Sequence, residues 1–82
     1  MPRYFLHLRD HVDEVLDPEG VELPNLAAVI KAVLSGARDL ISHEVKSQGS
    51  IDFRYRIDAE DSSGAIIYTL PFKEAVELIG LQ

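Results

Sequence analysis

The chain has 82 residues, of which 46% are hydrophobic and 27% are charged. This composition is typical of a globular protein, and the length predicts one domain, residues 1–82, with a small core. There is no cysteine, which excludes disulfides, thiolate zinc sites and cysteine nucleophiles. Fourteen acidic and eight basic residues give a formal net charge of −6, which favours basic partners over phosphate backbones.

The chain carries no recognisable targeting pattern. Its first ten residues alternate polar and apolar side chains and lack the apolar core of a secretory signal. No stretch approaches the roughly 18 apolar residues of a membrane span. We therefore expect a cytoplasmic protein that has no membrane partner.

Residues 3–9 alternate as a strand does. Tyr4, Leu6 and Leu8 share one face, which we expect to line the core. The opposite face carries the apolar Phe5 among polar residues. Two explanations stay open for Phe5: a second copy of the chain covers it, or it packs beneath the terminal helix through Phe72 or Val76.

Residues 10–23 contain a turn and a weak second strand. Asp17-Pro18-Glu19-Gly20 is a strong turn signal, and a short strand over residues 14–16, continuing irregularly to Leu23, is expected to pair with the first strand. The segment has no lysine or arginine, and its acidic residues predict a basic protein partner. They are Asp10, Asp13, Glu14, Asp17, Glu19 and Glu22.

Residues 25–46 form the longest amphipathic pattern. Asn25 is a favoured N-cap, and Gly49 is suited to a left-handed C-cap. The apolar residues recur at intervals of three and four, which predicts a helix with one stripe facing the core. They are Leu26, Val29, Ile30, Val33, Leu34, Ala37, Leu40, Ile41 and Val45.

Two strands and a short helix are expected after this helix. Residues 51–58 alternate strictly, which predicts a strand with Ile51, Phe53, Tyr55 and Ile57 inside. A turn at residues 60–64 leads to a second strand over residues 65–70, forming an antiparallel hairpin. A helix then starts at Phe72 and ends near Gly80. We predict an α+β fold of order β-β-α-β-β-α, with the long helix on one face of a four-stranded, mostly antiparallel sheet.

Three motifs of the sequence stand out. They are the opening Met-Pro-Arg-Tyr-Phe-Leu-His, the segment Asp17-Pro18-Glu19-Gly20-Val21-Glu22-Leu23, and the closing Leu70-Pro71-Phe72. Together they resemble a family of small bacterial proteins of unknown function. Leu6 stands where the family has a second phenylalanine. The resemblance covers nearly the whole chain and implies a standalone cytoplasmic domain, but the family carries no assigned activity or site residues.

The outer face of the sheet is the main candidate interaction surface. If the first and third strands both turn their apolar sides inward, this face gathers arginines, a histidine and an aromatic ring. Such a face can be solvated or self-associating, or it can stack and pair with single-stranded nucleic acid. Asp52 and Asp58 are placed to pair with the arginines, so we favour the first explanation. The candidate residues are Arg3, Phe5, His7, Arg9, Arg54 and Arg56.

Metal and catalytic motifs are weak. His7 and His11 have acidic neighbours, but one lies in a strand and the other in a loop, so their spacing does not preset a ligand pair. Asp39 and His43 share a helix face, where an ordinary surface pair is the usual outcome. We therefore predict no catalytic residue, no metal and no cofactor, and leave open whether the chain is an enzyme.

These observations predict a non-enzymatic interaction domain that forms a homodimer. The alternative is a nucleic-acid-binding module that uses the arginine-bearing face of the sheet.

Overall fold

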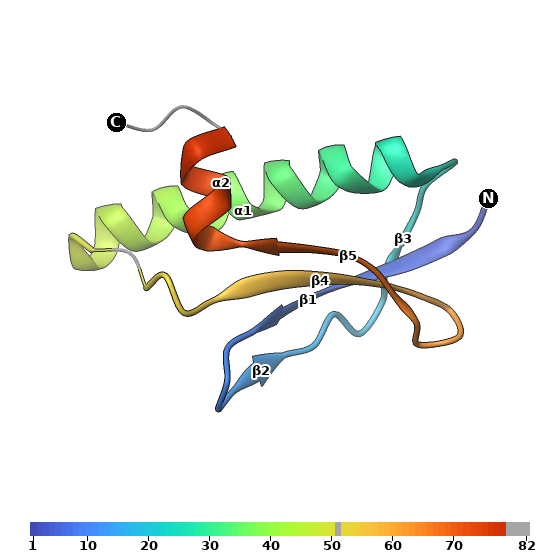
Figure 1. The fold of residues 1–82 in the computed structure, drawn as a ribbon, viewed down its shortest axis with the longest axis horizontal. Coiled ribbons are helices and arrows are strands. Elements are labelled where there is room, and N and C mark those ends of the chain that lie inside the picture. Colours follow the sequence, from blue (N-terminus) through green and yellow to red (C-terminus); the bar gives the residue numbers. More distant parts are fainter. Residues whose placement is uncertain (51, 79–82) are drawn as a thin grey trace.

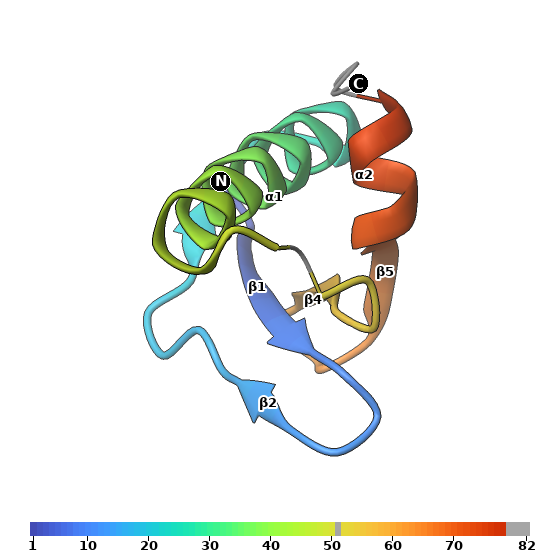
Figure 2. The same ribbon diagram turned by 90° about the vertical axis from the view of Figure 1, so that its left-hand side faces the viewer.

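The computed structural model describes residues 1–50 and 52–78. It has two layers, a sheet and a pair of helices that cover one of its faces (Figures 1 and 2). This is the α+β arrangement that the sequence predicts. The elements are β1 (Arg3–Arg9), β2 (Glu14–Val15), β3 (Val21–Glu22), α1 (Leu26–Gln48), β4 (Arg56–Asp61), β5 (Ile66–Pro71) and α2 (Phe72–Leu78).

The sheet is antiparallel, with the order β2-β1-β4-β5 and with β3 also paired to β1. β2 and β3 are two parts of one interrupted strand. Leu8 faces Val15 and Tyr4 faces Val21, so residues 16–20 lie opposite residues 5–7 and two extra residues bulge out. The predicted second strand, with its irregular continuation, is confirmed.

Helix α1 forms where the pattern places it. The Asn25 side chain accepts a hydrogen bond from the Ala28 N–H, and Gly49 ends the helix with a φ of 74°. Its buried residues form a narrow i, i+4 row: Val29, Val33, Ala37 and Ile41. The predicted stripe is wider than this row, because Leu26, Ile30, Leu40 and Val45 are exposed.

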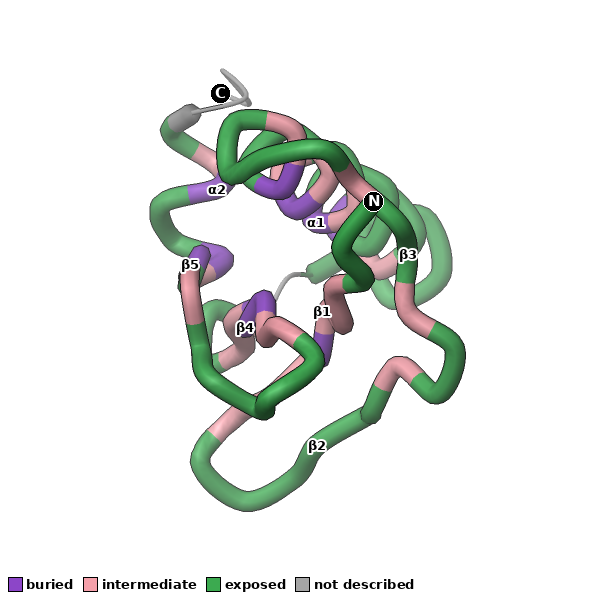
Figure 3. Tube along the Cα trace, turned by 90° about the vertical axis from the view of Figure 1, so that its right-hand side faces the viewer, coloured by how far each residue is buried: buried purple, intermediate pink, exposed green. Residues whose placement is uncertain are grey.

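The core lies between this row and the sheet. Ile57 and Ala59 of β4 and Leu70 of β5 face α1, and Phe72 and Ala75 of α2 close one end. Figure 3 shows the buried segments of α1, β4, β5 and α2 turned toward one another. The predicted terminal helix is thus present and contributes to the core. Its expected end near Gly80 lies outside the described residues.

The strand predicted over residues 51–58 is wrong in its bounds. Residues 52–55 form a turn, in which the Arg54 N–H donates to the Asp52 carboxylate (3.0 Å), and Phe53 is 53% exposed. The first residue predicted for this strand, Ile51, lies outside the described residues. The alternating pattern is continuous through Glu60, so pairing with Leu8 and Leu70 selects its second half for the strand.

The following turn is correspondingly shorter than predicted. Glu60 and Asp61 belong to β4, and the chain reverses through Ser62, Ser63 and Gly64. The Asp61 side chain accepts hydrogen bonds from Ser63 and from the Ala65 N–H, which stabilises the reversal. The predicted antiparallel pairing of the two strands is confirmed.

Neither described helix, α1 nor α2, combines the length and hydropathy needed to cross a membrane.

Candidate functional site

The strand pairing brings most of the predicted face together on the side of the sheet away from the helices. Arg9 lies directly opposite Arg56, His7 opposite Asp58, and Phe5 opposite Glu60. Tyr4, Leu6 and Leu8 contact the core, so the alternate residues of β1 turn outward. We call the set Phe5, His7, Arg9, Arg56, Asp58 and Glu60 the outer-face cluster.

Two predicted residues lie outside this cluster. Arg54 is in the turn before β4 and makes two side-chain hydrogen bonds with Asp52, at 3.0 and 2.9 Å. Its placement on the outer face of the sheet was wrong, because that placement depended on a strand starting at residue 51. Arg3 is at the start of β1, where its guanidinium pairs with Glu22 of β3 at 3.1 Å.

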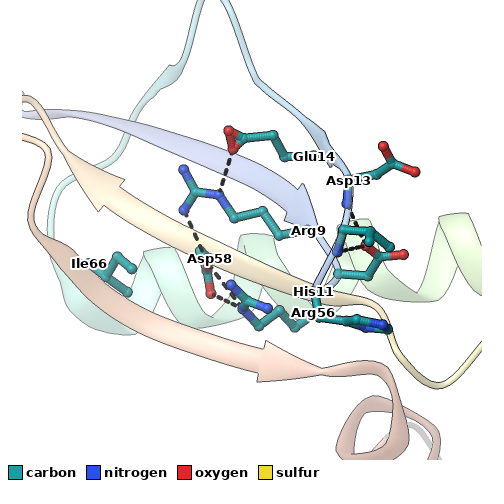
Figure 4. Close-up of a pocket in the computed structure, with 9 residues that line it drawn as sticks. Arg9, His11, Asp13, Glu14, Arg56, Asp58 and Ile66 are labelled. Atoms are coloured by element: carbon teal, nitrogen blue, oxygen red, sulfur yellow. Dashed lines mark hydrogen bonds and ion pairs between the residues drawn. The ribbon is translucent and has the colours of Figure 1, made fainter.

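Asp58 is the centre of the cluster and has no exposed surface. Its carboxylate accepts hydrogen bonds from Arg9 Nη1 (3.1 Å), Arg56 Nε (3.2 Å) and Thr69 Oγ1 (2.9 Å), as Figure 4 shows for the arginines. Burial by itself raises the pKa of this carboxyl group, but the bonds from Arg9, Thr69 and Arg56 outweigh burial and lower the pKa. Asp58 is therefore a buried anion that its neighbours neutralise.

Arg9 is shared among three carboxylates. Besides Asp58, it contacts Glu60 at 2.6 Å and Glu14 of β2 at 3.3 Å. The hydrogen bonds with Glu60 and Asp58 raise the pKa of the guanidinium above its usual value. Because β1, β2 and β4 each contribute to this group of charges, Arg9 ties three strands together rather than presenting a free cation.

His7 and Asp17 hold the bulge between β2 and β3 against β1. The Asp17 N–H donates to His7 Nδ1 at 3.0 Å, so the proton of the neutral imidazole is on Nε2, which faces Glu60 at 3.5 Å. The Asp17 carboxylate accepts from the N–H groups of Leu6 and Gly20, at 3.2 and 3.0 Å. These side-chain bonds replace the backbone pairing that the bulge interrupts.

Burial by itself raises the pKa of the Asp17 carboxyl group, but the N–H donors of Gly20, Leu6 and Glu19 outweigh burial and lower it. The predicted turn residue is therefore an anion that anchors the bulge.

Phe5 is half-buried and is partly covered from within the chain. Its ring stacks on His7, with ring centroids 6.3 Å apart, and a Cβ added to Gly20 would lie 2.8 Å from it. The alternative in which Phe5 packs against Phe72 or Val76 is wrong, because both of these contact the core on the other face of the sheet. The alternative in which a second copy covers Phe5 stays a prediction.

A hollow of about 390 Å³ lies between the β1–β2 hairpin and the outer-face cluster (Figure 4). Arg9, Arg56 and Asp58 line it together with the exposed residues 11–14. Asp10 shapes the hairpin, because its carboxylate accepts hydrogen bonds from the N–H groups of Val12 and Asp13, both at 2.7 Å. These bonds from Asp13 and Val12 also lower the pKa of Asp10.

Among residues 1–50 and 52–78, no three His, Asp or Glu side chains converge as metal ligands would. Asp39 and His43 are both exposed on α1, and no hydrogen bond or ion pair joins them.

The sequence-based list of site residues lacks five members of this arrangement. They are Glu14, Asp17, Asp58, Glu60 and Thr69, of which only Asp58 was named as a partner for the arginines. Glu60 follows Arg56 and Asp58 at the same two-residue spacing, so continued alternation was a signal that could have placed it in the strand. Thr69 reaches Asp58 from the neighbouring strand, and Asp17 reaches β1 from the bulge. No spacing within one segment indicates either of these contacts.

Residues 3–73 match the model of a family described as Domain of unknown function (DUF6894). The family relationship predicted from the sequence motifs is thereby confirmed. Neither the curated proteins nor the solved structures contain a match to the chain.

Proposed function

We propose that this chain, which belongs to the DUF6894 family of domains of unknown function, is a cytoplasmic protein-interaction domain that pairs with a second copy of itself through β5. The absence of cysteine suits a reducing compartment. The observation that carries the proposal is the character of the β5 edge, because an unpaired strand without charged residues invites pairing with another strand.

The two edges of the sheet differ. Within the described residues, β5 pairs with β4 alone, and residues 65–71 contain no charged side chain. Ile66, at the start of β5, is 54% exposed. The opposite edge is interrupted by the bulge and carries Glu14 and Glu22, whose negative charges would repel the same edge of a second copy. An antiparallel β5–β5 pair joins two sheets through a two-fold axis.

Two features shorten the β5 edge. The register shifts between β4 and β5 at Ile67, and Pro71 has no N–H to donate. The regular part therefore runs from Tyr68 to Leu70. We expect a dimer held by a few backbone hydrogen bonds together with apolar contact at Ile66, and therefore one that dissociates on dilution.

Ion pairing weighs against the nucleic-acid alternative. Each arginine of the predicted face has a carboxylate partner: Glu22 for Arg3, Asp52 for Arg54, and Asp58 for both Arg9 and Arg56. A phosphate would have to compete with a carboxylate that is already in place. Nucleic-acid binding stays a prediction, and a filter-binding titration at two salt concentrations checks it.

Sedimentation at a series of concentrations tests self-association. We expect the wild-type chain to pass from monomer to dimer, and Ile66→Lys to stay monomeric because a charged side chain would replace the apolar contact at this position. Val12→Lys adds the same charge at a residue that is 74% exposed in the hairpin and should dimerise normally. A wild-type chain that stays monomeric up to millimolar concentration would refute the proposal, and so would a dimer that tolerates Ile66→Lys.

Hydrogen exchange gives a second readout. Backbone N–H groups of β5 that do not bond to β4 should become protected as the concentration rises. Protection that rises on β2 and β3 instead would move the interface to the opposite edge and overturn the proposal.

A further inference from the structure

A small hollow separate from the outer-face cluster lies where the C-terminal half of α1 meets the start of α2. Its volume is about 240 Å³, and its apolar lining consists of Leu8, Leu40, Tyr55 and Phe72. Figure 2 looks onto this end of α1. The Phe72 N–H donates to the Tyr55 carbonyl at 2.9 Å, and the two rings lie 6.0 Å apart, so the aromatic lining is held in place by the backbone.

The charged lining of this hollow is entirely acidic. It consists of Glu44 on α1 and Asp52 in the turn before β4. Asp52 is paired with Arg54, which lies outside the lining and is exposed. Glu44 is half-buried, and no cation within residues 1–50 and 52–78 lies within ion-pair distance of it. A partly desolvated carboxylate beside an aromatic ring favours a cation as its partner.

The size of the hollow selects the kind of cation. Its volume is below the roughly 300–1,000 Å³ of typical small-molecule sites. A lysine or arginine side chain has an apolar stem that can lie along Leu8 and Leu40, and a charged end that can reach Glu44 across the Tyr55 ring. The net charge of −6 would also attract a basic protein.

We propose that this hollow is a docking site for one arginine or lysine side chain projecting from a partner protein. The acidic charge of the chain predicts a basic partner, and this hollow is the place where that partner would bind. It does not use β5, so it does not depend on pairing between two copies of the chain.

Nuclear magnetic resonance titration with a short Gly/Ser peptide that carries a single arginine tests this proposal. The matched probe is the same peptide with citrulline, which keeps the shape of arginine and removes its charge. We expect the arginine peptide to shift the signals of Glu44, Tyr55 and Phe72, and the citrulline peptide to bind about three- to tenfold more weakly. Equal binding of the two peptides would make the occupant an apolar or neutral group and overturn the proposal.

Two variants with the same loss of charge test whether the effect is local. Glu44→Gln should weaken binding of the arginine peptide by a similar factor. Glu19→Gln changes an exposed residue in the bulge and should leave this binding unchanged. Equal weakening by both would indicate general attraction to an acidic surface and overturn the proposal. Tight binding of spermidine without binding of the peptide would identify a free polyamine site, with the same consequence. The citrulline comparison uses the wild-type chain and does not depend on how the variants fold.

Discussion

The two faces of the sheet are both buried at β4, but by different interactions. Toward the helices, Ile57 and Ala59 lie under α1 with Leu70 beside them. Between them in the chain, Asp58 turns the other way and is equally buried, yet its neighbours are two arginines and a threonine hydroxyl. One strand thus carries an apolar contact surface on one side and a neutralised charge network on the other.

Because of this difference, we expect the stability contributed by the two faces to depend differently on pH and salt. Burial of apolar area changes little with pH or salt, whereas hydrogen bonds to a carboxylate depend on its ionisation. Because the outer-face charges satisfy one another, the face stabilises the fold without presenting free cations. The four predictions that follow separate these contributions.

Truncation of an apolar side chain on the helix-facing side of the sheet should reduce the free energy of unfolding the most. Leu70→Ala removes a fully buried side chain beneath α1 and leaves a cavity, so we expect a loss of about 2–5 kcal/mol in the free energy of unfolding. Urea denaturation monitored by circular dichroism measures it. The control is Leu16→Ala, an exposed residue, which should change stability by at most about 0.5 kcal/mol. Similar losses in both variants would contradict the placement of the core.

Removal of the negative charge of Asp58 should reduce the free energy of unfolding somewhat less. Asp58→Asn keeps the shape of the side chain but weakens its bonds with Arg9 and Arg56, for an expected loss of about 1.5–3 kcal/mol at neutral pH. The folded-state pKa of Asp58 lies below its ordinary value of 3.8. Its stabilisation is therefore complete above the ordinary pKa and is lost as the pH falls through the folded one.

Urea denaturation at a series of pH values measures this dependence. The difference in the free energy of unfolding between wild type and Asp58→Asn should become smaller as the pH falls below the ordinary pKa of 3.8. The difference in the free energy of unfolding between wild type and Leu70→Ala should stay constant over the same pH range. A gap for Asp58→Asn that does not depend on pH would indicate that the charge network contributes nothing to stability.

The bulge that covers Phe5 should be sensitive to one methyl group. Gly20 has a φ of +72°, and a Cβ there would lie 2.8 Å from both the Phe5 ring and the Tyr4 carbonyl oxygen. Gly64 has a φ of +86° with nothing within 4 Å, so Gly64→Ala measures the backbone strain alone, about 1–3 kcal/mol. Gly20→Ala should exceed it, because a backbone atom cannot move aside. Equal thermal unfolding midpoints for the two variants would contradict the tight cover over Phe5.

The sequence was sufficient for the elements whose local signals agree. The periodicity of residues 25–46, the Asn25 cap and the alternation of residues 3–9 each predict one structure, and the Asp-Pro-Glu-Gly turn marks the bulge. The bounds of β4 could not be predicted in the same way. Alternation runs from residue 51 to residue 60, and only pairing with β1 and β5 decides which part becomes the strand.

The outer-face cluster was predictable in outline only. The alternating pattern placed Arg9 and Arg56 on one face, and Asp58 was recognised as a possible partner for the arginines. That Asp58 is fully buried depends on side chains from β1 and β5, which no local pattern reveals. Arg54 was misplaced for the same reason as β4, and its pairing with Asp52 belongs to the turn.

Arg54 and Arg9 therefore form the sharpest test among the charged residues. Arg54 is 66% exposed and has one carboxylate partner, so solvent and salt screen the pair, and Arg54→Gln should leave the urea midpoint almost unchanged. Arg9 is 19% exposed and contacts three carboxylates. Arg9→Gln removes the cation that Asp58 and Glu60 share, and it should therefore lower the urea midpoint clearly. Added salt should reduce this deficit, because it screens the repulsion that the missing cation exposes. Equal midpoints for the two variants would mean that the buried pairs behave like surface pairs, and the distinction between the two faces of β4 would then be one of geometry alone.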